Sequence, residues 1–402
     1  MENTMTNLPQ GWEVKKLEEI ANIKGGKRLP KGENLLDNNT KFAYIRVADF
    51  QDNGTINLQN IKFINENTYN VLKNYKIYDD NLYISIAGTI GKSGIIPKEL
   101  NGAILTENAV KLEYIQNNIS NKFMYFFTLS NIFKTQIQTS TKIVAQPKLA
   151  ITRLKQIQIP LPPLKEQERI VGILDESFAK IDESIKILEQ DLLNLDELMQ
   201  SALQKAFNPL KDNAKENYKL PQSWEWKSLE EISENISAGG DKPKNCTESK
   251  TAKNQIPVYA NGVNNNGLVG YTDKATIIKP SLTISARGTI GFVCIRKEPY
   301  FPIVRLISLI PCENILCLHY LYFCLNFFIA KGEGSSIPQL TIPKFKSLQI
   351  PLPPLKEQEQ IAEHLDFVFE KAKALKELYT KELKDYEELK QSLLNKAFKG
   401  EL

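Results

Sequence analysis

The sequence is poor in the residues that most often build metal and catalytic sites. It contains two histidines, His319 and His364, and five cysteines among 402 residues. All the cysteines lie in the second half, and no two have the C-x-x-C spacing of a structural zinc site. We therefore expect no metal site, and we expect reduced, mostly buried thiols of the kind usual in cytosolic proteins.

Long apolar runs are also lacking. The most apolar stretch, residues 318–330, has 13 residues and includes His319 and Asn326, whereas a membrane-spanning helix needs about 20. The first ten residues are polar and do not resemble a signal peptide. We predict a cytoplasmic protein with no membrane segment.

Familiar catalytic motifs are missing as well. We find no nucleophile elbow, no H-E-x-x-H, no dinucleotide-binding glycine pattern and no methyltransferase-type N-P-P-[FYW]. Residues 88–93, GTIGKS, resemble a phosphate loop, but that loop would need glycine where Ile86 stands. Gly94 and Pro97 then follow instead of a long helix. We expect a strand ending in a glycine turn, and no active site.

What the chain does contain is a duplication. Residues 159–168 read IPLPPLKEQE, and residues 350–359 repeat the same ten letters at an offset of 191. Upstream matches have offsets of 212, 200 and 197, so the second copy is shorter in its globular part. A period this long indicates tandem duplication of a whole unit and excludes a solenoid.

Each copy follows the same plan. β-branched and aromatic runs, such as residues 42–47, 82–87 and 281–286, predict a strand-rich body. A short apolar helix is expected at about 121–133 and again at about 316–330. The proline-rich connector favours an extended backbone and precedes a long helix.

The two long helices are predicted at 164–207 and 355–398, where apolar residues recur every three or four positions. This spacing is typical of a coiled-coil seam. About 42 residues would form a rod of roughly 60 Å. We predict an α+β fold in which two similar mixed α/β domains are separated by two long helices that form an antiparallel coiled coil with pseudo-two-fold symmetry. The simpler alternative is that each helix packs only on its own domain.

Charge follows the expected domains. The first domain, residues 1–159, carries a net +6, and the central helix, residues 160–208, carries −5. The second domain, residues 209–349, carries +5, and the C-terminal helix, residues 350–402, carries −2. Basic bodies that alternate with acidic helices indicate an anionic partner for the bodies alone.

Cationic and polar residues on glycine-rich or asparagine-rich turns are the candidates for DNA contact. Glycine backbone beside Lys or Arg allows phosphate approach, and Arg can read guanine edges with two hydrogen bonds. For any one of them, an ordinary solvated surface residue is the competing interpretation. The candidates are Lys24, Lys27, Arg28, Tyr44, Arg46, Lys92, Lys142, Lys242, Lys244, Asn261, Asn264, Arg287, Ser335 and Ser336.

The duplicated I-P-L-P-P-L-x-E-Q connector, at 159–167 and 350–358, resembles that of the specificity subunit of type I restriction–modification systems. The resemblance covers essentially the whole chain. It implies two target-recognition domains that each read half of a split double-stranded DNA sequence, with the helix pair setting the unread spacer. The chain itself would be non-catalytic and bind no cofactor.

The resemblance also implies partners. Two methyltransferase (modification) subunits would dock on the helical regions and carry S-adenosylmethionine, and restriction subunits would use ATP and Mg²⁺. Other interpretations remain open. The chain could serve a different methyltransferase arrangement, act as a coiled-coil adaptor whose basic domains bind RNA or protein, or be an enzyme with an unrecognised site.

Overall fold

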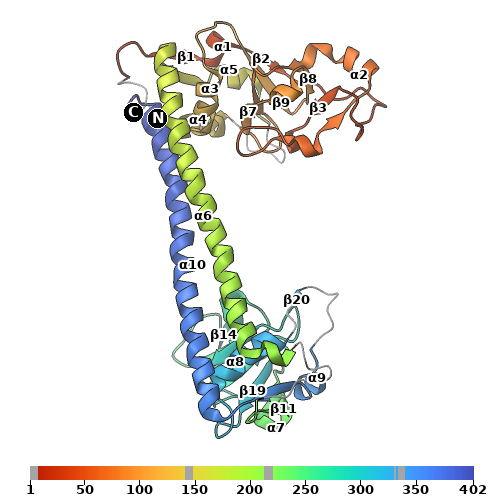
Figure 1. Cartoon of the computed structure of the whole chain (residues 1–402), viewed down its shortest axis with the longest axis vertical. Helices are drawn as coiled ribbons and strands as arrows, with labels where there is room; N and C mark the ends of the chain where they lie inside the picture. The colour runs from red at the N-terminus through yellow and green to blue at the C-terminus, as the bar shows by residue number, and fades with distance from the viewer. Residues whose placement is uncertain (1–7, 141–147, 212–220, 330–331, 334–339) are drawn as a thin grey trace. The chain divides into compact units, whose positions relative to one another are not determined.

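The chain folds as two compact units in the computed structural model, which describes residues 8–140, 148–211, 221–329, 332–333 and 340–402. The first unit comprises Met1–Leu188 together with Lys381–Leu402, and the second comprises Glu189–Thr380. The two long helices, α6 (Leu164–Lys211) and α10 (Leu355–Ala397), are each divided between the units. Their bounds lie within a few residues of the predicted ones (Figure 1).

The body of the first unit is built on two four-stranded sheets. The first has the order β2 (Ala21–Gly25), β9 (Ala109–Tyr114), β6 (Leu82–Ser85) and β7 (Ser93–Ile95). The second has the order β4 (Lys62–Phe63), β3 (Ala43–Ile45), β8 (Ala103–Leu105) and β5 (Lys76–Ile77). A ribbon pairs β1 (Glu13–Lys16) with β10 (Gln158–Leu161).

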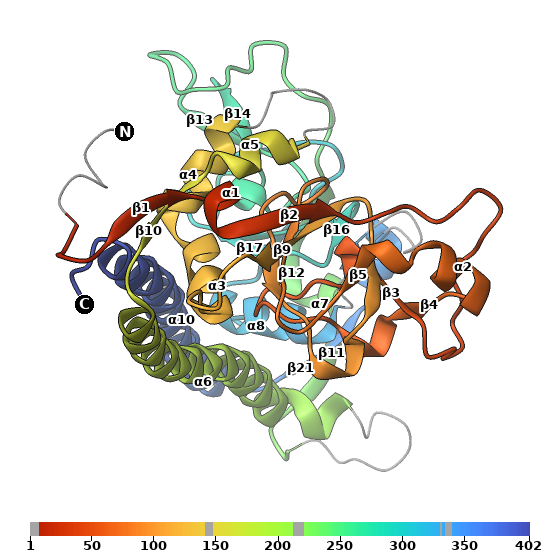
Figure 2. The ribbon, with the colours of Figure 1, turned by 90° about the horizontal axis from the view of Figure 1, so that it is seen from above.

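Short helices complete this unit: α1 (Leu17–Ile20), α2 (Glu66–Val71), α3 (Asn121–Leu129), α4 (Asn131–Ser140) and α5 (Ile151–Lys155). Figures 1 and 2 agree in placing α2 on the side of the body away from the long helices. On the opposite side, α3 contacts α6 through the rings of Phe126 and Phe178, and α4 lies beside α10, where Lys134 and Glu387 line one pocket. The sheet that holds β2 and β9 therefore lies between the outer sheet and the helices.

The single helix predicted over residues 121–133 is wrong in one respect, because the structure has two helices there. The helix is interrupted at Ser130. The Ser130 hydroxyl donates to the Phe127 carbonyl at 2.7 Å and accepts from the Phe133 amide at 3.3 Å. A serine side chain that bonds nearby backbone groups favours a helix start over a helix interior. Ser130 thus begins α4.

The core of the first unit includes the end of the chain. Leu82, Val110 and Phe123 are fully buried in a cluster that also contains Phe398 of the C-terminal segment. The Phe398 ring lies 5.1 Å from the ring of Phe123 and 5.5 Å from that of Phe127. Residues far apart in the sequence therefore share one apolar interior.

The second unit repeats this architecture. Its main sheet has the order β12 (Ser233–Ala238), β19 (Ile307–Pro311), β15 (Ser281–Ile284) and β17 (Val293–Arg296). A smaller sheet has the order β14 (Leu268–Thr272), β13 (Ile256–Tyr259) and β18 (Phe301–Pro302). The remaining pairs are β11 (Glu225–Ser228) with β21 (Gln349–Leu352), and β16 (Thr289–Ile290) with β20 (Gly332–Glu333).

Three helices belong to the second body: α7 (Leu229–Ile232), α8 (Leu318–Phe328) and α9 (Ile342–Lys346). The sheet β2-β9-β6-β7 of the first unit and the sheet β12-β19-β15-β17 of the second have matching strand orders. The other sheet of each unit contains one parallel pair, β3 with β8 and β13 with β18. Strand β12 has a register irregularity between Ser233 and Asn235. The predicted duplication is confirmed at the level of topology.

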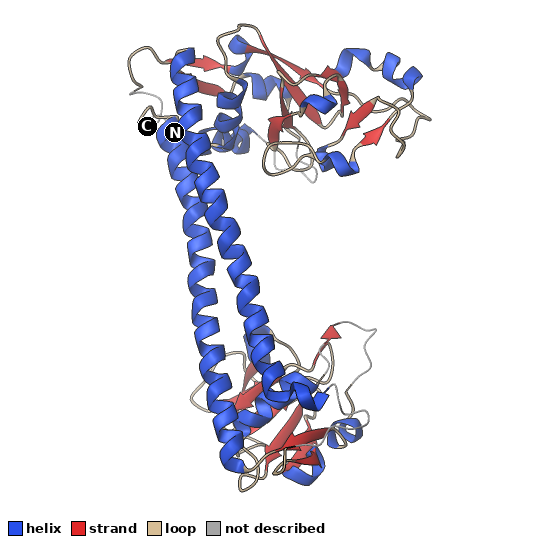
Figure 3. Cartoon of the chain, viewed as in Figure 1, coloured by secondary structure: helices blue, strands red, loops and turns tan. Residues whose placement is uncertain are grey.

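The two long helices run antiparallel, as predicted. In the first unit, Lys390 of α10 donates to Asp182 of α6 at 2.6 Å. In the second unit, Lys376 of α10 pairs with Asp196 of α6. Numbers rise along α6 as they fall along α10, so the directions are opposite. Figure 3 shows the two long helices side by side.

The predicted apolar seam is confirmed on α6 and partly wrong on α10. Ile181, Leu188 and Leu195 of α6 are buried. On α10, Leu378 is 55% exposed and Leu389 is 45% exposed, whereas the small Ala372 is buried. Within the described residues, no helix is long and apolar enough to cross a membrane.

Candidate nucleic-acid interface

The glycine turn that follows β2 brings several predicted contact residues together in the first unit. A Cβ atom on Gly26 would lie 2.1 Å from the Thr106 carbonyl oxygen, so only glycine permits this approach. The Lys27 amide donates to the Leu105 carbonyl at 2.9 Å. The Tyr44 hydroxyl donates to the Lys27 carbonyl at 2.7 Å. Lys27, Arg28 and Tyr44 are therefore held where β2 meets the second sheet.

The cations of this unit are largely paired with carboxylates. Arg28 lies 2.7 Å from Glu107, and Lys24, on strand β2 itself, lies 2.5 Å from Glu113. Lys92, on the separate turn between β6 and β7, lies 2.8 Å from the fully exposed Asp52. Each pair has one solvent-exposed partner. Ion pairs open to solvent contribute little to stability, so a phosphate group can compete for each cation.

The pKa of the Glu107 carboxyl reflects two opposing effects, burial and hydrogen bonding. Burial alone would raise the pKa of this carboxyl, but the hydrogen bonds from Arg28, from its own backbone and from Thr106 outweigh burial and leave its pKa below the ordinary value. Glu107 therefore stays ionised beside Arg28 at neutral pH. The positive charge of Arg28 is locally cancelled until another anion arrives.

The Arg46 side chain is held by hydrogen bonds within the first unit. Its guanidinium contacts both carboxylate oxygens of Asp49, which is 1% exposed, and donates to the Asn60 carbonyl at 3.0 Å. The Arg46 amide also donates to Asp49 at 2.7 Å. These bonds close the turn after β3. A DNA contact by Arg46 stays a prediction, and it would have to use the guanidinium edge that these bonds leave unused.

The corresponding glycine turn of the second unit packs against the segment before β19. A Cβ on Gly239 would lie 2.6 Å from the Ile303 amide nitrogen. The carbonyl of Gly239 accepts from the Arg305 amide, and that of Gly240 accepts from the Val304 amide, each at 2.8 Å. The turn and the segment 303–305 thus form one hydrogen-bonded unit.

Asn261 joins a third segment to this arrangement. Its side chain accepts from the Ala286 amide at 2.8 Å and donates to the Val304 carbonyl at 2.6 Å. Arg287 and Arg305, the residues that follow Ala286 and Val304, are therefore brought to the same region, and both are exposed. Sequence reasoning identified Asn261 and Arg287 but missed Val304 and Arg305.

Of the remaining predicted residues, Lys242, Lys244 and Asn264 are exposed on loops of the second unit. Lys142, Ser335 and Ser336 lie outside the described residues. Among ion pairs between described side chains, none involves Lys242, Lys244 or Arg305. The second unit therefore presents uncompensated cations where the first presents neutral pairs.

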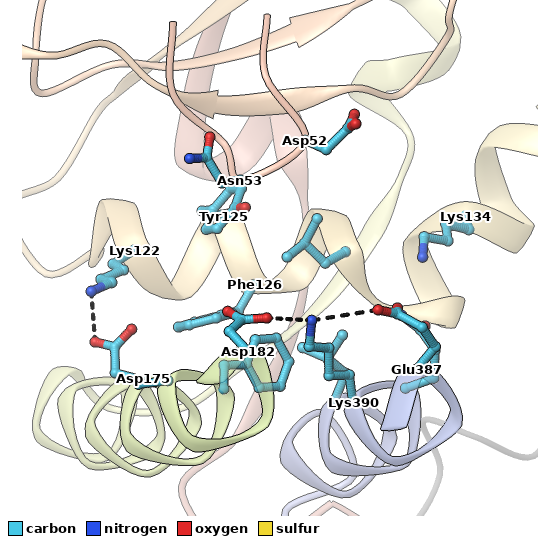
Figure 4. A pocket seen from close by; sticks show the side chains of 15 residues that line it. Asp52, Asn53, Lys122, Tyr125, Phe126, Lys134, Asp175, Asp182, Glu387 and Lys390 are labelled. Atoms are coloured by element: carbon cyan, nitrogen blue, oxygen red, sulfur yellow. Dashed lines mark hydrogen bonds and ion pairs between the residues drawn. The ribbon is translucent and has the colours of Figure 1, made fainter. Parts of the chain in front are cut away.

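A cavity of about 690 Å³ lies in the first unit between α3, α4 and the two long helices (Figure 4). Lys122 pairs with Asp175 at 2.6 Å, and Lys390 lies between Asp182 at 2.6 Å and Glu387 at 3.6 Å. The Lys122–Asp175 pair ties helix α3 of the body to α6, and the Lys390–Asp182 pair joins α10 to α6. Among the described residues, no group of three or more His, Cys, Asp or Glu side chains could hold a metal ion.

Comparison with known proteins gives a consistent answer. Residues 9–192 and 221–384 match the family described as type I restriction modification DNA specificity domain. A putative type I specificity subunit of Mycoplasma pneumoniae is 29% identical over 357 residues, which cover 87% of each chain. A putative type I restriction enzyme specificity subunit of Methanocaldococcus jannaschii is 24% identical, in an alignment that covers 98% of this chain and 94% of the relative.

Solved structures have the same fold. A chain from a study of complex assembly and conformational transition of the type I R-M system matches with a TM-score of 0.79 at 20% identity, over 98% of this chain and 100% of that one. The HsdS subunit of Thermoanaerobacter tengcongensis matches with a TM-score of 0.61 at 20% identity, over the full length of both chains. The chain belongs to the type I restriction–modification DNA specificity family, and it is the DNA specificity subunit of such a system, a non-catalytic member of the complex.

Proposed function

We propose that this chain reads a bipartite DNA sequence, with one half-site for each strand-rich body and a spacer whose length depends on α6 and α10. The observation that carries this proposal is the antiparallel register: the residue numbers of the pairs Asp182–Lys390 and Asp196–Lys376 have the same sum. The equal sums mean that α6 and α10 have the same antiparallel register in each unit, which is the property that a spacer made of paired helices requires.

The DNA-reading face would be the region around the glycine turn of each body. In both units the turn that leaves the first strand of the main sheet packs on the segment that enters the second strand. Most of the predicted cations lie on or near these turns in the sequence, and Lys92 lies on the separate turn between β6 and β7. Lys24, Lys27, Arg28, Lys92, Lys242, Lys244 and Arg287 remain our candidates for phosphate or base contact, with Tyr44, Arg46, Asn261 and Asn264 as further candidates and Lys142, Ser335 and Ser336 on undescribed segments.

We further propose that α6 and α10 dock two modification subunits. Apolar side chains on these helices remain exposed outside the helix pair, including Leu193, Leu198 and Phe367, which are 58%, 51% and 59% exposed. Acidic helices would be repelled by phosphate, which leaves them available to protein partners. S-adenosylmethionine would be carried by the modification subunits, and ATP with Mg²⁺ by restriction subunits, in the cytoplasm.

The decisive experiment shortens both helices together. Removing residues 185–191 and 381–387 deletes seven residues from each helix at matched positions of the register. Seven residues span about 10 Å, or about three base pairs. We expect methylome sequencing of cells that express the chain with its partners to show the same two half-sequences with a spacer about three base pairs shorter.

A change in either half-sequence with an unaltered spacer would contradict the proposal. The coiled-coil adaptor interpretation, which predicts partner binding without DNA sequence preference and with little dependence on salt, does not agree with membership of the DNA specificity family. Specific DNA binding should instead weaken steeply as salt rises, because phosphate contacts release counterions.

A further inference from the structure

The segment Val304–Arg305 is the most strained non-glycine backbone in the second unit's candidate interface. We propose that it forms a preorganised recognition tip, in which Arg305 reads the edge of a guanine in the half-site bound by this unit. The inference rests on the proposed function, because it assigns a base-reading element to a DNA-binding surface. It identifies a residue that the glycine and asparagine patterns of the sequence do not mark.

Strain is the first observation. Val304 has a φ of 54° and Arg305 a φ of 60°, so two consecutive residues with side chains adopt the left-handed conformation. This conformation is unfavourable for residues other than glycine, and it is rarest for β-branched residues such as valine. Strain of this kind persists where the surrounding structure enforces it, and it is concentrated at functional sites.

The surrounding structure does enforce it. The Val304 and Arg305 amides donate to the carbonyls of Gly240 and Gly239, and the Val304 carbonyl accepts from Asn261. Gly239 cannot carry a side chain without meeting the Ile303 amide. The backbone of the tip is therefore held from two sides before any ligand arrives.

Both side chains are open to solvent. Val304 is 51% exposed and Arg305 is also exposed. An exposed valine in the left-handed region gains little burial in return for its strain, and glycine would adopt the same backbone freely. The sequence nevertheless keeps a branched apolar residue beside an arginine at this point.

The first unit shows that the duplicated fold does not require such a tip. The Gly26 amide donates to the Ala109 carbonyl, as the Gly239 amide donates to that of Leu306. This equivalence places Glu107 and Asn108 where Val304 and Arg305 stand. Among the described residues, neither Glu107 nor Asn108 has a positive φ, and Glu107 pairs with Arg28. The tip is thus a property of one half-site reader.

The chemistry of the tip favours a base edge. A guanidinium presents two parallel N–H donors that match the O6 and N7 acceptors of guanine in the major groove. A rigid backbone lowers the ordering cost of binding. Arg287 follows Ala286, which bonds Asn261, and Lys242 lies two residues after Gly240, so we assign these two cations to the flanking phosphates.

The test uses the whole chain assembled with its methyltransferase partner, and selects bound duplexes from a random pool. For Arg305→Ala we expect loss of a guanine preference at one position of the second half-site, by about 5- to 150-fold in discrimination, with the first half-site unchanged. Arg305→Lys should lose most of the same preference, because lysine lacks the planar fork. Lys279→Ala is the matched control. Lys279 precedes β15 at its Ser281 end, whereas Arg305 lies near the Ile284 end, so this variant should keep the full consensus.

Val304→Gly tests the strain separately. Its Tm should be unchanged or up to about 4 °C higher, since relief of strain offsets the greater entropy that glycine loses on folding, while discrimination at the same position falls. A lower Tm would show that Val304 stabilises the fold, which would overturn the strained tip.

Three results would separate the failures. Uniform weakening on all sequences by Arg305→Ala would show a phosphate contact and overturn base reading. An unchanged consensus and affinity would remove Arg305 from the interface. If the complex that contains the parent chain showed no sequence preference, the proposed function itself would be refuted.

Discussion

The buried side-chain amide of Gln167 accepts a hydrogen bond from the backbone amide of Ser120, 2.8 Å away. Its nitrogen donates to the carbonyls of Asn118 and Pro162, at 3.0 and 2.9 Å. One side chain therefore joins the long helix, the proline connector and the residue that caps α3.

Gln358 makes the same three bonds in the second unit. It accepts from the Cys317 amide at 2.9 Å and donates to the carbonyls of Ile315 and Pro353 at 2.9 and 2.8 Å. This explains why glutamine ends the duplicated connector motif in both copies. The motif encodes the joint between each body and its helix.

We predict that Gln358→Met destabilises the second unit by about 1–3 kcal/mol, because it leaves buried backbone groups at Cys317 and Ile315 without partners. Urea unfolding combined with hydrogen exchange of the Cys317 amide would measure this. Gln190→Met, at an exposed position of α6, should change stability by less than about 0.5 kcal/mol. Equal effects of the two substitutions would show that the joint adds nothing to stability.

Arg46→Ala should destabilise the first unit by about 3 kcal/mol, because it leaves the buried Asp49 carboxylate unpaired. The midpoint of thermal unfolding gives the size of the effect. A variant with full stability but a lost preference in the first half-site would mean that Arg46 contacts DNA and is not needed for folding.

Glu107→Gln should make Arg28 available to DNA by removing its negative partner. We expect tighter binding at low salt and a log–log salt dependence steeper by about 0.9, the value for one additional phosphate contact. Glu99→Gln removes the same charge from an exposed position between β7 and β8 and serves as the control. Identical slopes in the two variants would exclude Arg28 from phosphate contact.

The same substitution should alter acid stability. The folded-state pKa of Glu107 lies below its ordinary value of 4.5, so this carboxylate stabilises the fold above that value, and the contribution is lost as pH falls through the lower, folded-state pKa. Glu107→Gln should therefore show a smaller loss of stability below about pH 4.5 than the parent chain. Circular dichroism during acid titration would detect the difference.

Two glycine substitutions should change the stability of the fold in opposite directions. Gly172 is exposed within α6 and has open space around its missing side chain, so Gly172→Ala should stabilise the helix by about 1 kcal/mol. Gly26→Ala should destabilise the first unit by about 3 kcal/mol, because its Cβ would meet the Thr106 carbonyl. Thermal unfolding of the two variants tests both signs, and a stabilising Gly26→Ala would show that the turn does not need its close approach.

Much of this fold could be predicted from the sequence because it depends on local patterns. Apolar spacing located α6 and α10, and the identical connectors revealed the duplication. The break at Ser130 was missed, since the apolar pattern of α3 continues through it and only the hydroxyl's bonds to the backbone show the break.

The candidate site was harder to predict because charge pairing depends on tertiary contacts. Nothing near Arg28 in the sequence indicates Glu107, which is 79 residues away. Nor does any glycine or asparagine mark Val304 and Arg305 as left-handed. Their conformation comes from Gly239, Gly240 and Asn261, which approach only in the folded unit.

The place of Phe398 in the first core has a consequence for biosynthesis. A ribosome delivers residues 8–140 long before it delivers Leu394, Ala397 and Phe398, yet the apolar cluster of the first unit includes all three. The N-terminal body therefore leaves the ribosome with part of its interior open to water. Maturation of the first unit must wait until residues 394–398 are translated, and a nascent chain stalled before them would expose Phe123 and Phe127 to chaperones or proteases.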